Sequence, residues 1–166
     1  MSIRPLTPTD AAAFRELRLR ALREHPEAFT SSFEEDVLQP VSATERRLAG
    51  TGGDRFLGAF AGGALQGMVG LTVESRAKIR HKGHIVSMYV APESRRHGLG
   101  HALLQAAIDH ARAGGALAQL VLTVTAGNDA ARRLYYDAGF RTFGVEPRAI
   151  KVAGAYHDKE HMILFL

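Results

Sequence analysis

The chain contains no cysteine, only four lysines and no long uninterrupted run of apolar residues. The lack of cysteine excludes a disulfide scaffold, Cys-ligated zinc, iron–sulfur clusters and catalysis by a thiol. No stretch approaches the roughly 18 consecutive apolar residues that indicate a membrane-spanning helix. The first residues also lack the charged and apolar regions of a signal peptide. We therefore expect a cytoplasmic protein that does not have a membrane as a partner.

The residues that are present have the composition of an ordinary globular protein, with 46% hydrophobic and 23% charged residues. A length of 166 residues is typical of one domain, so we expect a single domain over residues 1–166. Lys and Arg outnumber Asp and Glu by 21 to 17, which gives a net charge of +4. The 17 arginines are spread along the chain and no nucleic-acid-binding motif appears, so we expect no nucleic-acid partner.

The spacing of apolar residues alternates between the period of strands and the period of helices. We expect strands at Ser2–Pro5, Arg55–Ala61, Ala64–Glu74, Gly83–Val90, Gln119–Thr125, Phe140–Val145 and His161–Leu166. We expect helices at Pro8–Glu24, Ser42–Ala49, Gly100–Ala113 and Asp129–Ala138. Residues 27–40 have no clear period. This order predicts one mixed α/β sheet with about four helices on its faces. The apolar run at 119–125 is expected to be buried on both faces.

A glycine-rich turn follows the expected Gly83–Val90 strand and leads directly into a helix. It reads Arg95-Arg96-His97-Gly98-Leu99-Gly100. Glycines at such a turn let a ligand approach the backbone, and the first N–H groups of a helix are unpaired and lie at the positive end of its dipole. The turn is therefore a predicted anion site, to which Arg95 adds charge-assisted hydrogen bonds, and a diphosphate is its natural ligand.

Two common phosphate-binding motifs do not fit this turn. A P-loop is excluded because the chain contains no GK[ST]. The dinucleotide fingerprint GxGxxG fails because Leu103 stands in place of its third glycine, and because the turn follows several strands rather than the first one. The turn does fit the pattern R/Q-x-x-G-x-G/A, at Arg95, Gly98 and Gly100.

Two neighbouring segments extend this match. Val90-Ala91-Pro92 precedes the turn as V-x-P, and the segment Asn128–Phe140 reads N-x-x-A-x-x-L-Y-x-x-x-G-F. With these motifs the chain resembles the GNAT N-acetyltransferase superfamily, and in particular bacterial members of undetermined substrate. The resemblance is strong over residues 84–140 and loose over residues 1–60. It implies a single GNAT-type α/β domain with a mixed, mostly antiparallel sheet, in which residues 84–140 form the acetyl-CoA-binding core.

The resemblance also implies which residues contact acetyl-CoA. In this family a splayed strand pairs with the pantetheine arm as an added strand would, and the glycine turn wraps the diphosphate. The cofactor-binding residues implied in this way are Met88, Tyr89, Val90, Arg95, Arg96, His97, Gly98, Leu99, Gly100, His101, Asn128 and Tyr135. The commonest form of the family has Gly and Arg where Arg96 and His97 stand, so the backbone of Gly98 and Gly100 is the firmer part of this prediction.

Tyr135 is the expected catalytic acid, because acetyl transfer expels a thiolate that a nearby phenol can protonate. Proton removal from the amine is assigned to His84, where several family members keep a Glu and serotonin-type enzymes a His. Glu74, Glu34 and Glu35 are alternatives for this step, as is water without a dedicated base. Without cysteine, transfer is expected to be direct, in a ternary complex. No metal is expected, because no histidine pair has the spacing and partners of a metal site.

The identity of the acceptor stays open at this stage. The resemblance places it between Pro26–Pro40 and Pro147–Glu160, and the acidic run Glu34-Glu35-Asp36 could attract a cationic amine. We expect transfer of an acetyl group to a primary amine, with either a small molecule or a protein as the acceptor. The alternatives are a protein N-terminal or lysine acetyltransferase and a non-catalytic acyl-CoA-binding module. A homodimer is expected by analogy with the family.

Overall fold

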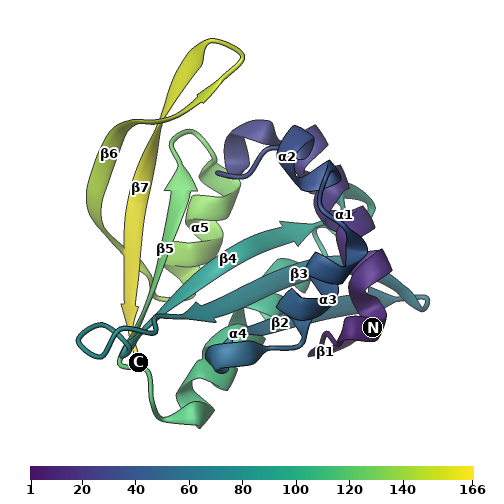
Figure 1. Ribbon diagram of the computed structural model, residues 1–166. Coiled ribbons are helices and arrows are strands. Elements are labelled where there is room, and N and C mark those ends of the chain that lie inside the picture. The colour runs from purple at the N-terminus through teal and green to yellow at the C-terminus, as the bar shows by residue number, and fades with distance from the viewer.

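The computed structural model describes all residues, 1–166, as seven strands and five α-helices (Figure 1). The strands are β1 (Ser2–Pro5), β2 (Arg55–Ala61), β3 (Ala64–Val73), β4 (Lys82–Val90), β5 (Gln119–Thr125), β6 (Arg141–Val152) and β7 (Ala155–Phe165). The α-helices are α1 (Ala11–Glu24), α2 (Phe33–Val37), α3 (Val41–Leu48), α4 (Leu99–Gly114) and α5 (Asp129–Asp137). Short 3-10 turns are η1 (Pro8–Asp10), η2 (Pro26–Ala28), η3 (Thr51–Gly53) and η4 (Pro92–Ser94).

The seven strands form one sheet in the order β1-β2-β3-β4-β5-β7-β6. All neighbouring pairs are antiparallel except β4 and β5, which run parallel. This parallel pairing is short, because it joins only Lys82–His84 to residues 119–121 of β5. Beyond His84 the two strands diverge, which Figure 1 shows as an opening between β4 and β5. The fold therefore leaves one edge of β4 unpaired in the middle of the sheet.

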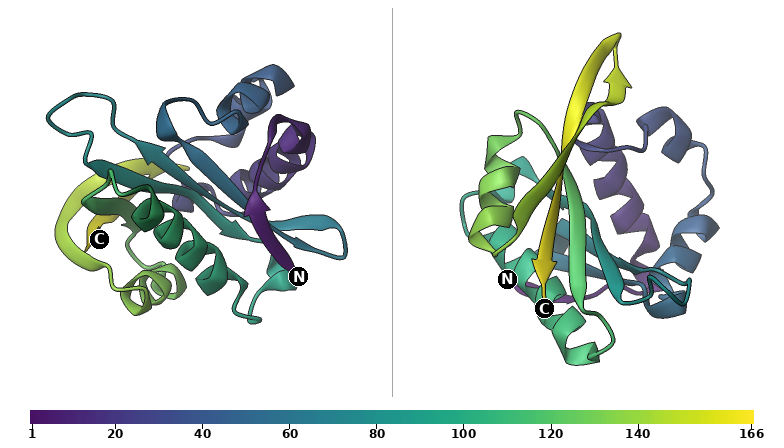
Figure 2. Two further views of the ribbon diagram at one scale, coloured as in Figure 1. Left: turned by 90° about the horizontal axis from the view of Figure 1, so that it is seen from below. Right: turned by 90° about the vertical axis from the view of Figure 1, so that its left-hand side faces the viewer.

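The helices lie on the two faces of this sheet. Figure 2 shows α1 and α3 on one face and α4 and α5 on the other. On the first face Phe14 of α1 meets Phe56 of β2 edge to face, with ring centroids 5.6 Å apart. On the second face Leu103 and Leu104 of α4 are fully buried against β2–β5. Apolar residues recur at helical spacing in both helices, which is why one stripe of each packs on the sheet.

Strand β4 contains a bulge just before its C-terminal end. Gly70 of β3 pairs with Val86, and Met68 pairs with Tyr89, so β4 carries one residue more than β3 over this interval. Ser87 absorbs the extra length with a φ of 54°, a conformation that is uncommon outside glycine. A bulge of this kind bends its strand and redirects side chains. Here it lies where β4 has already separated from β5.

The expected order of strands and the mixed sheet are confirmed, and the helices number five because residues 27–40 contain α2. This helix has no apolar stripe; instead, Ser32 and Glu35 form a capping box, which explains why the apolar spacing did not predict it. The last two strands were expected to be shorter. They extend to Arg141–Val152 and Ala155–Phe165 because they form a hairpin whose outer part is exposed, so its residues need no apolar pattern.

The expectation that Gln119–Thr125 is buried on both faces is wrong. Leu120, Leu122 and Val124 are buried, but Thr123 on the opposite face is exposed. This face of β5 looks onto the space that the divergence from β4 creates, and no helix covers it there. The continuous apolar run therefore belongs to a strand with one buried face and one face that borders cavities.

Candidate functional site

The turn between β4 and α4 directs unpaired backbone N–H groups outward at the start of a 16-residue helix. Arg96 and Gly98 both adopt left-handed conformations, with φ of 65° and 72°, and Gly98 is the N-cap of α4. The N–H of Ala102 bonds the carbonyl of Gly98 at 3.0 Å, so the N–H groups between them have no partner inside the helix. A Cβ on Gly98 would meet no atom within 4 Å. The turn is thus an accessible anion site at a helix N-terminus.

A cavity of about 400 Å³ lies beside this turn, in the opening between β4 and β5; we call it the turn cavity. Every residue that the sequence predicted to bind the cofactor lines it, except His97, which is exposed in the turn. The lining residues that were predicted are Met88, Tyr89, Val90, Arg95, Arg96, Gly98, Leu99, Gly100, His101, Asn128 and Tyr135. Residues from a strand, a turn and two helices therefore meet around one space.

The backbone of Val90 has its hydrogen-bonding groups on the side of this opening. The N–H of Ala91 bonds the carbonyl of Gln66 on β3, and Val90 pairs with Gly67 one position along. Hydrogen-bonded and non-hydrogen-bonded pairs alternate in an antiparallel ladder, so the N–H and C=O of Val90 point away from β3. The carbonyl accepts a hydrogen bond from Nε of Arg95 at 2.9 Å. The N–H remains free to bind a ligand in the turn cavity.

A network of charged groups holds the turn against helix α1. Arg20 donates to both carboxylate oxygens of Glu93 in the turn, at 2.7 and 2.9 Å, and to Glu24 at 2.9 Å. The hydroxyl of Tyr89 donates to Glu24 at 2.8 Å, and burial together with this bond raises the pKa of Tyr89 to about 12. The guanidinium of Arg95 lies 5.6 Å from the centre of the Tyr89 ring. These contacts fix the orientation of Arg95 at the anion site.

Tyr135 lies on α5 where two cavities share a wall. Its side chain is 7% exposed and packs edge to face on Phe140, with ring centroids 6.1 Å apart. Burial alone raises the pKa of Tyr135 to about 12, so the phenol holds its proton firmly at neutral pH. The residue lines both the turn cavity and a second cavity of about 240 Å³. Tyr135 is therefore placed to donate a proton to a group that lies between the two.

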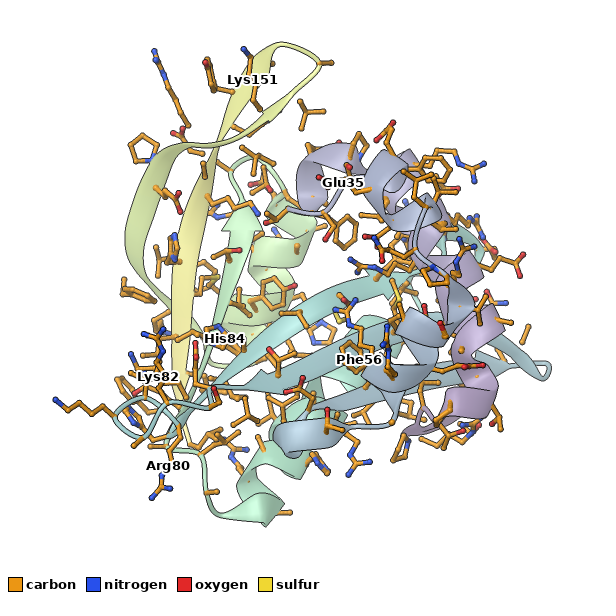
Figure 3. The ribbon with its side chains drawn as sticks, viewed as in Figure 1. Glu35, Phe56, Arg80, Lys82, His84 and Lys151 are labelled. Carbon is orange, nitrogen blue, oxygen red and sulfur yellow. The ribbon has the colours of Figure 1, made fainter.

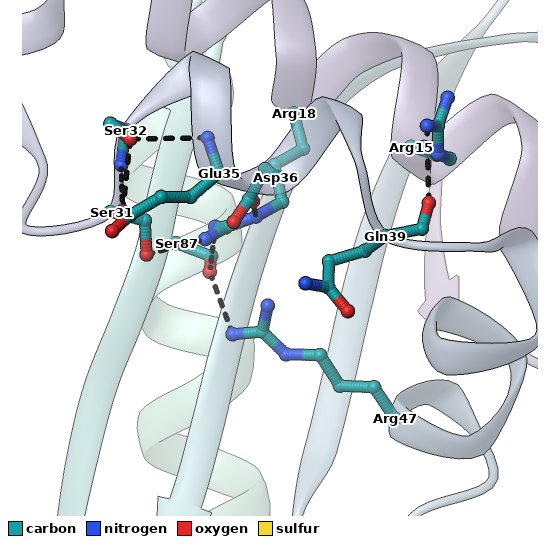
Figure 4. Close-up of polar contacts among 9 residues, drawn as sticks. All are labelled: Arg15, Arg18, Ser31, Ser32, Glu35, Asp36, Gln39, Arg47 and Ser87. Carbon is teal, nitrogen blue, oxygen red and sulfur yellow. Dashed lines mark hydrogen bonds and ion pairs between the residues drawn. The ribbon is translucent and has the colours of Figure 1, made fainter.

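The second cavity is rich in positive charge, and we call it the basic cavity. It is lined by Arg18 of α1, Arg47 of α3 and Lys159 of β7, and no acidic residue lines it. Arg18 and Arg47 both donate to the hydroxyl of Ser87, the bulge residue, at 3.0 and 3.3 Å (Figure 4). Sequence reasoning missed this cluster, because its members come from three distant segments and no motif joins them.

The candidates for the catalytic base lie at the edge of these cavities rather than inside them. His84 is the last β4 residue that pairs with β5, and Figure 3 marks its position near the point where the strands separate. Its Nε2 lies 2.9 Å from Oε1 of Glu74, so these two separate candidates form one pair. Neither residue lines the turn cavity or the basic cavity. Val86, two residues further along the same strand, does line the basic cavity.

The acidic run of residues 34–36 does not line either cavity, so the cavities do not support the expectation that it attracts a cationic amine. Glu35 caps α2, where its carboxylate accepts from the N–H and hydroxyl of Ser32 at 3.3 and 2.9 Å. Asp36 forms an ion pair with Arg18. Glu34 is exposed. The run therefore stabilises α2 and neutralises one arginine, and the cavity behind it keeps a positive charge.

Three further features of the molecule concern metal binding, membrane spans and the start of α5. No group of three or more His, Asp or Glu side chains is placed to hold a metal ion. None of the helices is both long and apolar enough to cross a membrane. Asn128 is the N-cap of α5, and its side-chain oxygen accepts from the N–H of Ala131 at 3.3 Å.

Comparison with known proteins gave consistent results. The sequence profile described as "Acetyltransferase (GNAT) family" matches residues 14–140. A GNAT-family acetyltransferase from Streptococcus pneumoniae is 30% identical, with a TM-score of 0.87 over 99% of both chains. A proposed acetyltransferase from Salmonella typhimurium, solved with its cofactor acetyl-CoA, is 26% identical, with a TM-score of 0.83 over 100% of this chain and 94% of that one.

A phosphinothricin acetyltransferase from Sinorhizobium meliloti, solved in complex with acetyl-CoA, shares the fold with a TM-score of 0.87 at 20% identity. The alignment covers 99% of this chain and 88% of that one. A search of curated proteins gave no match.

Proposed function

The chain belongs to the acetyltransferase (GNAT) family, and we propose that it transfers an acetyl group from acetyl-CoA to a primary amine. The observation that carries this proposal is the position of Tyr135 in the wall shared by the turn cavity and the basic cavity. The first cavity has the groups that a diphosphate and an amide-bearing arm require, and the second has room for an acceptor. We further propose that residues 1–166 act as one domain with its acetyl-CoA-binding core at residues 84–140.

The residues around the turn cavity suit acetyl-CoA. The first turn of α4 and Arg95 would hold the diphosphate, because free N–H groups, a helix dipole and a guanidinium converge there. The free edge of β4 would pair with the pantetheine arm through the backbone of residues 88–90. A Cβ on Gly100 would lie 3.7 Å from Met88 and Leu134, so this glycine leaves open the side of the helix on which the ligand would lie.

The chemistry of the transfer follows from this placement. Acetyl-CoA supplies a thioester, whose carbonyl carbon the acceptor amine attacks. The free N–H of Val90 would donate to the carbonyl oxygen as negative charge develops on it. Tyr135 would protonate the departing thiolate, since its phenol carries a proton at neutral pH and lies in the wall between the two cavities.

Proton removal from the amine falls to His84, acting through water. His84 lies outside both cavities and pairs with Glu74, which orients the imidazole. A water chain along the open face of β4 would connect it to the amine. A replacement of His84 that changes neither the rate nor its pH dependence would favour water without a dedicated base.

Two measurements on the purified protein test the proposal. Calorimetry with CoA and acetyl-CoA measures binding at the turn cavity, and a thiol-release assay with a panel of amines measures transfer. Thiol release that depends on both the amine and Tyr135 supports an N-acetyltransferase. Binding of acetyl-CoA without release for any small amine, peptide or protein would instead support a non-catalytic acyl-CoA-binding module.

A further inference from the structure

Positive charge in the basic cavity is not balanced by the residues around it. Arg18 is paired with Asp36, but Arg47 and Lys159 have no carboxylate partner. Lys159 is only 6% exposed, and its one hydrogen bond is to the hydroxyl of Thr30 at 2.7 Å. Buried charges are normally paired, because removing an ion from water is costly.

The surroundings of Lys159 explain why no partner is supplied by the protein. Its cross-strand neighbour Glu146 bonds Nε2 of His161 at 2.9 Å instead. Burial lowers the pKa of Lys159, and burial together with the charge of Arg18 lowers the pKa of Arg47 to about 10. Both shifts show that the two cations are held in an environment that disfavours their charge. A bound anion would relieve this cost.

The cations and the reaction centre lie at different parts of the same small space. Tyr135, Met88 and Thr123 line both cavities and mark where the acceptor amine must meet the thioester. Arg47 and Lys159 line the basic cavity but not the turn cavity. Its volume of about 240 Å³ is below the range of about 300–1,000 Å³ typical of sites for drug-sized ligands. The part of an acceptor that enters this cavity is therefore small.

We propose that the acceptor is a small amino acid whose free carboxylate is bound by Arg47 and Lys159 while its amine faces Tyr135. This inference rests on the proposed function, since it names the substrate class of the same site. The guanidinium fork of Arg47 suits a carboxylate, and Lys159 adds a second cation. In the reaction the amine nitrogen forms a bond to the acetyl carbon and the C–S bond breaks. One amine proton ends on the sulfur, which gives an N-acetyl amino acid and CoA.

A matched acceptor screen tests this proposal. The acceptors are free L-amino acids, their carboxamides, the corresponding decarboxylated amines and short peptides, each assayed by thiol release with acetyl-CoA. We expect at least one free amino acid to exceed its own carboxamide in kcat/KM by about tenfold or more, which is the effect of one charge-assisted hydrogen bond. Equal or better rates with carboxamides, decarboxylated amines or peptides would overturn the inference and leave acetyl transfer intact. No release from any acceptor would overturn the proposed function itself.

Variants with neighbouring controls separate acceptor binding from folding. Arg47→Met and Lys159→Met should each raise KM for the free amino acid about tenfold to a hundredfold, and leave KM for acetyl-CoA unchanged. Arg46→Met and Lys151→Met remove exposed cations beside the same segments and should change neither constant. Cζ of Arg47 lies 4.7 Å from the centre of the Phe56 ring, so Arg47→Met also removes a packing contact. Lys159→Arg therefore provides a second check at the other cation, because it retains the charge and should keep most of the affinity for the free amino acid. An unchanged KM for the free amino acid in both Arg47→Met and Lys159→Met would refute the assignment of these residues to the carboxylate.

Discussion

Replacement of Gly100 by alanine should weaken binding at the anion site without lowering the stability of the fold. The added Cβ would lie 3.7 Å from Cε of Met88 and from Cδ2 of Leu134, which is ordinary van der Waals contact, so the free protein can accommodate it. Gly100 lies inside α4 and has no positive φ, so alanine is also the better helix former there. We therefore expect the free energy of unfolding to rise, by at most about 1 kcal/mol.

The same methyl group should weaken acetyl-CoA binding. A backbone N–H reaches a phosphate oxygen at about 2.9 Å, and a carbon atom beside that N–H keeps a ligand at a larger distance. Loss of one charge-assisted hydrogen bond costs about 1.5–3 kcal/mol, which corresponds to about a tenfold to 150-fold increase in Kd. Gly100→Ala is thus expected to be as stable as the wild type or more so, and yet to bind acetyl-CoA much more weakly.

Gly114→Ala is the matched control, because it lies at the other end of the same helix and its Cβ would meet nothing within 4 Å. It should bind acetyl-CoA with unchanged affinity. Urea unfolding measures the stability of both variants, and calorimetry measures Kd. Equal acetyl-CoA affinity in the two variants would show that the diphosphate does not lie against the N-terminus of α4. A loss of stability in Gly100→Ala alone would show that the packing around this glycine is tighter than the distances indicate.

Three further predictions concern protons. Tyr135→Phe should lower kcat about a hundredfold, with acetyl-CoA Kd unchanged, because it removes only the proposed acid; stopped-flow thiol release and calorimetry check this, and unchanged turnover would exclude the role. Because Tyr89 and Tyr135 both have pKa values raised to about 12, the unfolded state loses their protons first, so stability should fall as the pH rises from about 10 to about 12. Tyr135→Phe should make this fall less steep in urea unfolding, and a fall of equal steepness in the variant would contradict the assignment. His84→Gln should lower kcat/KM at neutral pH about a hundredfold in the thiol-release assay, because it removes the proposed base, whereas an unaltered kcat/KM would leave proton removal to water.

The local motifs, and the family resemblance that rests on them, were sufficient to predict the elements that surround the turn cavity. Two segments each contain their functional residues within a few positions of one another: Arg95–Gly100 and Asn128–Phe140. The helices that begin in these segments, α4 and α5, fix the orientation of those residues. All but one of the residues predicted from these segments line the turn cavity, which is also lined by Ala130, Ala131 and Leu134, residues that were not predicted. The exception, His97, lies on the exposed side of a turn whose path is set by the left-handed conformations of its neighbours Arg96 and Gly98. The spacing of residues in the sequence does not indicate left-handed backbone conformations such as these, so it could not show that His97 does not line the cavity.

The acceptor side could not be predicted in this way, because no local pattern contains it. Arg18, Arg47 and Lys159 come from α1, α3 and β7, and they meet only because the sheet brings these elements around the separation of β4 from β5. The contacts of the acidic run beside them could not be predicted for the same reason: its charge is visible in the sequence, but its partners Ser32 and Arg18 are not. A charged residue therefore indicates a ligand of opposite charge only when no ion pair within the fold already neutralises it.

The bulge at Ser87 connects the two halves of the site. Because Ser87 is an extra residue in β4, Val86 and Tyr89 both lie on the face that α1 covers, although three positions separate them, and the bulge bends the strand between them. Tyr89 reaches Glu24 on the α1 face while the N–H of Val90 faces the opening. The same bulge presents the Ser87 hydroxyl to Arg18 and Arg47. One inserted residue therefore sets both the edge that would pair with the acyl donor and the position of the cations that would bind the acceptor. Deletion of Ser87 should accordingly impair acetyl-CoA binding and acceptor KM together, whereas Ser87→Ala, which keeps the bulge, should leave acetyl-CoA Kd unchanged in calorimetry.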